Sequence, residues 1–139
     1  MKTLKLIIAS FLLMGTMNIQ AQTNEPNNKE TNIATETINV YYFHNTRRCE
    51  TCKAVESVTM STLEDSFPEQ MKNGEITFES LNIEKEENEP LARKLHVSGQ
   101  ALLFVKNGNK KDMTSDAFMY ARTNPDKLKE KILKTIENL

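Results

Sequence analysis

The chain of 139 residues divides into short apolar runs and stretches in which apolar residues recur at helical spacing. Residues 37–43 are rich in β-branched and aromatic side chains, which predicts a strand. Residues 50–67 place apolar side chains on one side of a helix. A second strand is predicted over residues 75–83 and a short helix over residues 87–96.

The pattern then changes to a continuous apolar run. Residues 101–105 read Ala-Leu-Leu-Phe-Val, which is typical of a strand buried on both faces. The following Asn107-Gly108 is a hairpin signal and predicts a fourth strand near residues 110–114. A last helix is expected after Asn124 and Pro125, with an apolar stripe formed by Leu128, Ile132, Leu133, Ile136 and Leu139.

Phe118, Met119 and Tyr120 lie between the fourth strand and the last helix and are more apolar than a connection needs. We expect them to pack onto the core or to form part of a partner-binding rim.

The predicted order is strand, helix, strand, helix, strand, strand, helix. A right-handed crossover makes the first two strands parallel, and the hairpin adds an antiparallel edge. The sequence therefore predicts an α/β fold with one mixed four-stranded sheet and helices on both faces.

The N-terminus has the pattern of an export signal. Lys2 and Lys5 precede an apolar run over residues 6–14, and Ile19-Gln20-Ala21 is a plausible cleavage site. The run is shorter than the roughly 20 apolar residues of a membrane-spanning helix. We expect residues 1–21 to be removed and the protein to be exported, to the periplasm if the source is a Gram-negative bacterium. No cysteine lies in this segment or directly after it, so a lipoprotein is not expected.

Residues 22–36 are polar and predict a disordered leader, which leaves residues 37–139 as one domain. The whole chain has 18 basic and 19 acidic residues, so no basic surplus points to nucleic acid as a partner.

Cys49 and Cys52 are the only two cysteines in the chain. Side chains three residues apart on a helical turn lie close enough to close into a disulfide. Closing a loop of four residues restricts the unfolded chain by roughly 2 kcal/mol, against about 3 kcal/mol for a loop of fifteen. The spacing therefore favours a redox-active disulfide over a structural staple.

Cys49 is the expected attacking sulfur because a helix N-terminus favours a thiolate and because Arg47 and Arg48 add positive charge nearby. Glu50 acts in the opposite direction. Cys52 lies deeper in the predicted helix, so we expect it to resolve the mixed disulfide that Cys49 forms.

Two further interpretations concern metals. His44 is predicted to end the first strand, where it is either a polar loop residue or a group that shares a proton with Cys49 or binds metal. The thiolates of Cys49 and Cys52 are also suited to a soft ion such as Cu(I) or As(III). A structural zinc site is disfavoured, because it needs four protein ligands.

The order of the elements, with Cys49-Glu50-Thr51-Cys52 after the first strand, resembles the thioredoxin fold over residues 37–139. Residues 42–56 are similar to exported thioredoxin-like proteins of the ArsF-type family, named for a nitrophenyl compound nitroreductase subunit. The resemblance implies a redox-active disulfide as the working group. No flavin- or nicotinamide-binding pattern accompanies it, so no other cofactor is expected.

Three features depart from ordinary thioredoxins. Glu50-Thr51 replaces Gly-Pro between the cysteines, and residues 40–43 carry no carboxylate. Gln100 or Ala101 stands where a cis-proline usually faces the cysteines. These departures bear on substrate docking and proton transfer.

The leading hypothesis is an exported thiol-disulfide oxidoreductase whose client is a protein disulfide or an oxidised small molecule. The resemblance implies a membrane electron donor of the thiol-disulfide interchange type. The alternatives are a soft-metal or metalloid binding protein and a non-catalytic subunit whose cysteines tune assembly. Reduction of a generic disulfide distinguishes the first hypothesis from the other two.

Overall fold

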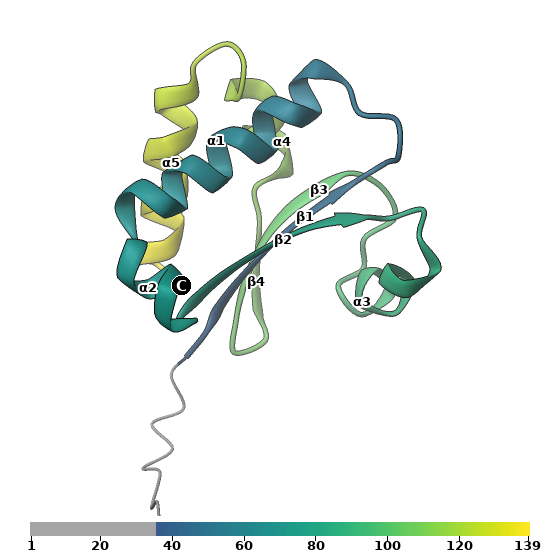
Figure 1. The fold of residues 1–139 in the computed structure, drawn as a ribbon, viewed down its shortest axis with the longest axis horizontal. Coiled ribbons are helices and arrows are strands. Elements are labelled where there is room, and N and C mark those ends of the chain that lie inside the picture. Colours follow the sequence, from purple (N-terminus) through teal and green to yellow (C-terminus); the bar gives the residue numbers. More distant parts are fainter. Residues whose placement is uncertain (1–35) are drawn as a thin grey trace, which may run out of the picture. The chain divides into compact units, whose positions relative to one another are not determined.

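The computed structural model describes residues 36–139, in which one four-stranded sheet carries helices on both faces (Figure 1). The predicted signal, residues 1–21, lies outside the described residues, as does the predicted leader, residues 22–36, apart from Glu36. Within the described part of the chain, no helix has the length and hydrophobicity of a membrane span.

The strands lie in the order β2-β1-β3-β4. β1 pairs with β2 in parallel and with β3 antiparallel, and β3 pairs antiparallel with β4. This arrangement confirms the predicted mixed four-stranded sheet. The bounds are β1 Ile38–His44, β2 Ile76–Asn82, β3 Ala101–Lys106 and β4 Asn109–Asp112.

Figure 1 shows α1, α4 and α5 on one side of the sheet and α3 on the other side. A short 3-10 turn, η1, precedes α3. The bounds are α1 Glu50–Ser66, α2 Pro68–Asn73, η1 Glu86–Asn88, α3 Glu89–Lys94, α4 Thr114–Tyr120 and α5 Pro125–Glu137.

Alternate residues of β1 and β3 point into two apolar layers. Tyr42 and Phe104 pack with α1 and α5 on one face, while Phe43 and Leu103 pack with α3 on the other. All four side chains are almost fully buried. β3 is therefore buried on both faces, as its apolar run predicts. The segment with the two cysteines follows the end of β1, so packing of the sheet determines where this segment begins.

The predicted helix over residues 50–67 is correct as far as Ser66, but a second helix that the pattern did not predict follows it. Pro68 begins α2, where its fixed backbone angle suits the first helical turn. Gly74 ends α2 with a φ of 80°, in the left-handed region that glycine adopts without a steric penalty.

The fourth strand is shorter than predicted, because the chain turns into α4 after Asp112. The Asp112 carboxylate accepts the backbone N–H of Thr114 at 2.8 Å, which stabilises this turn. Phe118 and Tyr120 pack against the core, whereas Met119 is 58% exposed. The predicted apolar connection is thus a helix with one exposed apolar side chain.

The predicted helix over residues 87–96 is also shorter, and α3 ends at Lys94. His96, two residues later, has a φ of 56°, which no helix accommodates. The hairpin prediction is confirmed, because Asn107 and Gly108 have φ values of 50° and 80°, as a tight turn between antiparallel strands requires.

Candidate functional site

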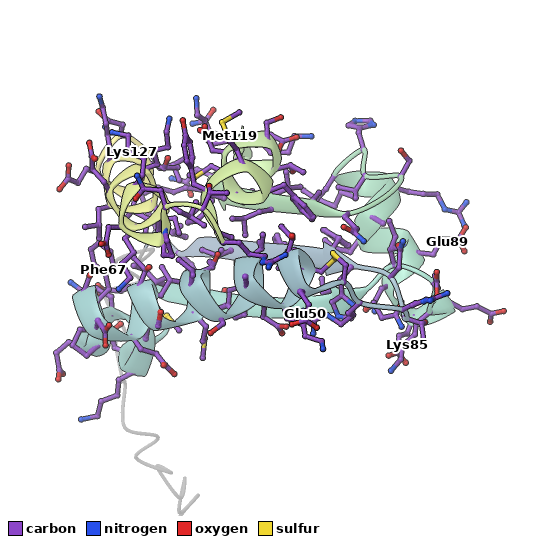
Figure 2. All side chains as sticks on the ribbon, turned by 90° about the horizontal axis from the view of Figure 1, so that it is seen from above. Glu50, Phe67, Lys85, Glu89, Met119 and Lys127 are labelled. Carbon is purple, nitrogen blue, oxygen red and sulfur yellow. A yellow bond between two sulfur atoms is a disulfide. The ribbon has the colours of Figure 1, made fainter. Side chains whose placement is uncertain are left out.

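Cys49 and Cys52 are joined by a disulfide, with their Cα atoms 5.0 Å apart. Figure 2 shows the bond between the two sulfur atoms close to Glu50, at the start of α1. The predicted pairing is confirmed. The disulfide lies just beyond the end of β1, at His44, after a loop of four residues.

Cys49 is the N-cap of α1 and has an extended backbone, so it precedes the helix instead of lying on its first turn. The backbone N–H of Cys52 points at Cys49 Sγ, with 3.1 Å between nitrogen and sulfur. A helix N-terminus presents unpaired N–H groups and partial positive charge, which favour an anion at the N-cap. Cys49 therefore occupies the position at which a thiolate is best stabilised.

The two sulfurs differ in access. Cys49 is exposed, whereas the side chain of Cys52 lies in the core and is only 1% exposed. A molecule in solution can therefore reach Cys49 directly, while Cys52 is shielded. This difference agrees with the expectation that Cys52 is the deeper cysteine.

The sequence led us to expect that Arg48 adds positive charge beside Cys49, but in the structure this charge is paired. Its guanidinium forms an ion pair with Glu56 of α1 and lies over the ring of Tyr42, 5.7 Å from the centroid. Positive charge that faces a carboxylate this closely is largely neutralised for other neighbours. Arg47 is exposed and forms no ion pair within residues 36–139, so it is the arginine that leaves local charge uncompensated.

Glu56 is held in its ionised form. Burial acts to raise the pKa of this carboxyl, but hydrogen bonds from Ser80 and Arg48 and the positive charge of Arg48 and His44 outweigh it and lower the pKa. Glu56 thereby connects α1 to β2 and to the loop before Cys49.

Glu50 opposes a thiolate less than the sequence analysis expected, because Lys53 compensates its charge. The Lys53 ammonium lies 2.9 Å from the Glu50 carboxylate. This hydrogen bond, together with the charge of Lys53 and then of Arg122, lowers the pKa of the Glu50 carboxyl. Both members of the pair are well exposed, so solvent screens their effect on Cys49.

Tyr42 supports the helix that carries the cysteines. Its buried hydroxyl donates a hydrogen bond of 2.9 Å to the carbonyl of Cys52. Burial raises the pKa of the Tyr42 phenol, so the group stays protonated and continues to donate at neutral pH. Residues 40–43 of β1 carry no carboxylate, but Tyr42 in this segment provides a phenol that hydrogen-bonds to α1 at Cys52.

His44 lies at the end of β1, and its Nδ1 is 2.9 Å from the carbonyl of Asn45. Its ring also lies beside Tyr42, with 5.9 Å between the centroids. In the described structure His44 makes no hydrogen bond to either sulfur. The geometry thus agrees with a polar residue at a strand end.

The sequence alone leaves open whether Gln100 or Ala101 faces the cysteines, and the structure distinguishes the two. Gln100 Oε1 lies 3.5 Å from Cys52 Sγ, whereas Ala101 begins β3 and is buried beside Phe43. Gln100 also lines an open polar cavity of about 640 Å³ that includes Ser98. Gln100 is therefore the residue that approaches the disulfide.

The loop before Cys49 is tied to the end of β2, which the sequence analysis missed. The Thr46 backbone N–H donates to the Glu84 carboxylate at 3.1 Å, and the Asn82 amide donates to the Thr46 hydroxyl at 2.8 Å. These contacts join residues more than 35 positions apart and hold the cysteine loop in place. The sequence signal that could have predicted these contacts is the presence of polar residues just after two strands that lie side by side in parallel.

Residues 36–139 contain no group of three or more His, Cys, Asp or Glu side chains that could hold a metal ion. The soft-metal interpretation therefore depends on the two sulfurs alone, after reduction of the disulfide.

No protein-family model matches this sequence, and no curated protein matches it significantly. Several solved thioredoxins are similar to the structure. Thioredoxin O2 from Arabidopsis thaliana in the oxidized state shows 25% identity and a TM-score of 0.43, over 56% of this chain and 62% of that one. The Fasciola hepatica thioredoxin shows 21% identity and a TM-score of 0.45, over 71% and 81%. The germline-specific thioredoxin Deadhead from Drosophila melanogaster shows 19% identity and a TM-score of 0.46, over 73% and 84%.

Proposed function

We propose that this chain is an exported thiol-disulfide oxidoreductase that works through the Cys49–Cys52 pair. One observation carries the proposal: an exposed sulfur at a helix N-cap is bonded to a buried sulfur three residues later. Nucleophilic attack needs an accessible thiolate, and rapid release of the client needs a second thiol within reach. The pair supplies both.

In the reducing direction, the Cys49 thiolate attacks one sulfur of a client disulfide. The client S–S bond breaks, a Cys49–client disulfide forms, and the first client sulfur leaves as a thiolate. Cys52 then loses its proton and attacks Cys49 Sγ. The Cys49–client bond breaks, the Cys49–Cys52 disulfide forms, and the second client sulfur leaves.

The client thus receives two electrons and, after protonation of its two thiolates, becomes a dithiol. The reverse sequence oxidises a client dithiol. The reduction potential of the pair decides which direction prevails. A strongly reducing value indicates delivery of electrons, and an oxidising value indicates formation of client disulfides.

Single cysteine replacements test the assignment of roles. The Cys52→Ser variant should accumulate a stable mixed disulfide through Cys49, because the resolving sulfur is missing. The Cys49→Ser variant should trap no client, because Cys52 is shielded. Non-reducing electrophoresis followed by mass spectrometry measures both, and equal trapping by the two variants would refute the roles.

We further propose that the electron donor is a membrane thiol-disulfide interchange protein and that residues 1–21 are an export signal. The charged and then apolar pattern of residues 1–21 supports export. The donor is what the resemblance of residues 42–56 to exported thioredoxin-like proteins implies. Mass spectrometry of the mature protein should find an N-terminus at Gln22. A full-length protein that remains in the cytoplasm would contradict export.

A further inference from the structure

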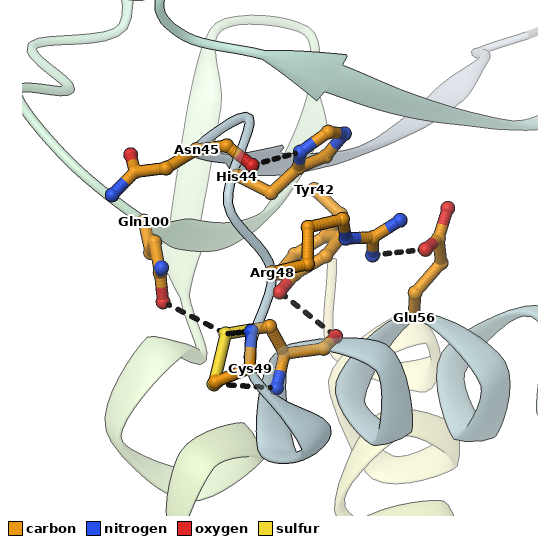
Figure 3. A network of polar contacts seen from close by, with 8 residues as sticks. Tyr42, His44, Asn45, Arg48, Cys49, Glu56 and Gln100 are labelled. Atoms are coloured by element: carbon orange, nitrogen blue, oxygen red, sulfur yellow. Dashed lines mark hydrogen bonds and ion pairs between the residues drawn. A yellow bond between two sulfur atoms is a disulfide. The ribbon is translucent and has the colours of Figure 1, made fainter.

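Backbone hydrogen bonding does not distinguish the two sulfurs of the disulfide. The Cys52 N–H lies 3.1 Å from Cys49 Sγ, and the Cys49 N–H lies 3.2 Å from Cys52 Sγ (Figure 3). Each sulfur therefore has one N–H donor. A difference in their chemistry therefore comes from their positions relative to the helix N-terminus, from burial and from side chains.

Burial makes it harder for the resolving sulfur, Cys52 Sγ, to become a thiolate. Cys52 is 1% exposed, so little water can hydrogen-bond to its thiol or its thiolate. A buried thiolate without sufficient hydrogen bonds is disfavoured by desolvation. Resolution nevertheless requires Cys52 to lose its proton before or as it attacks.

The described residues offer no buried carboxylate to assist this proton loss. Their buried side chains with polar groups, apart from the cysteine itself, are Thr59, Thr62 and Tyr42, whose hydroxyl donates to the Cys52 carbonyl. Glu56 is half-buried, but its oxygens are engaged by Arg48 and Ser80. Within the described part of the chain, no buried carboxylate is therefore free to accept the proton of Cys52.

Gln100 is the side chain that reaches Cys52. Its Oε1 lies 3.5 Å from Cys52 Sγ, and Figure 3 shows it approaching the disulfide from the side opposite to Arg48 and Glu56. A carboxamide carries an acceptor oxygen and a donor NH₂ on one planar group. The oxygen can accept the S–H of the thiol, and rotation of the amide presents an N–H to the thiolate.

We propose that Gln100 is a positioning residue for the resolving step, a role that rests on the proposed oxidoreductase function. It hydrogen-bonds to Cys52 in both protonation states, because the 1% exposure of Cys52 leaves little room for water at the sulfur. Gln100 takes up no proton itself. The proton leaves Cys52 for solvent or for the first client thiolate, while the N–H of Gln100 stabilises the sulfur as it attacks Cys49.

A chromogenic disulfide separates the two steps of the reaction. The reduced full-length protein is mixed with one equivalent of dithiobis(nitrobenzoate), and release of coloured thionitrobenzoate is followed by stopped flow. Attack by Cys49 releases the first thionitrobenzoate, and attack by Cys52 on the mixed disulfide releases the second. The first phase reports Cys49 and the intact fold, and the second phase reports Cys52.

The Gln100→Met variant keeps the length of the side chain and removes its donor and acceptor. It should slow the second phase about tenfold at neutral pH, since a hydrogen bond to a charged group is lost, and leave the first phase within about twofold. The pH at which the second phase reaches half its maximum should rise by about one unit, which corresponds to the same factor of ten.

Two further variants control the experiment. Gln100→Asn retains the amide and should restore much of the second-phase rate and its pH profile. Gln70→Met makes the same change on α2, away from the disulfide, and should alter neither phase.

The inference is overturned if Gln100→Met leaves the second phase and its pH profile unchanged, accelerates the second phase, or slows both phases equally. A wild-type protein that releases no thionitrobenzoate at all contradicts the proposed function itself. The two failures are therefore distinguishable.

Discussion

At the residue scale, the chemistry depends on the different surroundings of Cys49 and Cys52. Cys49 is exposed at the N-cap of α1, and Cys52 is buried one turn later beneath Tyr42 and Gln100. The spacing of the two cysteines was sufficient to predict their pairing. The contacts of Tyr42 and Gln100 were not predictable, because each joins the cysteines to a residue whose position depends on the packing of the sheet.

The Tyr42→Phe variant removes the hydroxyl that donates to the Cys52 carbonyl. The oxidised variant should lose about 1 kcal/mol in its free energy of unfolding, because a buried hydrogen bond is lost. Urea denaturation measures the loss. Tyr120→Phe is the matched control, since the Tyr120 hydroxyl makes no hydrogen bond within residues 36–139. Equal effects of the two variants would contradict a specific role for Tyr42.

The Arg48–Glu56 pair should make stability depend on pH. The pKa of Glu56 is lowered in the folded protein, so its contribution is present above the ordinary value of 4.5 and is lost as the pH falls below it. Glu56→Gln should cost about 1 kcal/mol at neutral pH and clearly less in acid, where the wild-type carboxyl is also protonated. Urea denaturation at both pH values tests this, and an equal loss at both would contradict it.

At the element scale, long or strongly patterned segments were predictable, and short ones were not. The apolar periods located α1, α5 and all four strands to within a few residues. α2 and α4 were missed because six or seven residues show too little periodicity to separate a helix from an apolar connection. α4 has no side-chain cap, and the buried Ala117 shows that packing against the core stabilises it.

α5 should be sensitive to its N-cap. The Asn124 side chain accepts the backbone N–H of Lys127 at 3.1 Å, and Asn124→Ala leaves that donor unsatisfied. We expect the free energy of unfolding to fall by about 1 kcal/mol. Asn109→Ala, on the exposed β4, is the control and should have a smaller effect in the same denaturation experiment. A larger loss from the control would contradict the capping role.

At the scale of the whole domain, helices cover the two faces of the sheet unequally. On the face that carries α3, the strands present apolar side chains under the helix and polar side chains beyond it. Phe43 and Leu103 lie under the short α3. Farther along the same face, Asn39 and Thr77 are paired by a hydrogen bond of 3.0 Å. Polar partners of this kind tolerate water where no helix covers the strand. The layers on both faces leave the cysteine loop at one end of the sheet, which is where a client would dock under the proposed function.

The most direct test of the account is the alkylation of the reduced protein by iodoacetamide as a function of pH, with each cysteine followed by mass spectrometry. Cys49 should react much faster than Cys52 and should reach half its maximal rate at a pH below about 8.5, the ordinary value for a free cysteine. Two sulfurs that are equally inert at neutral pH would contradict the proposed redox function.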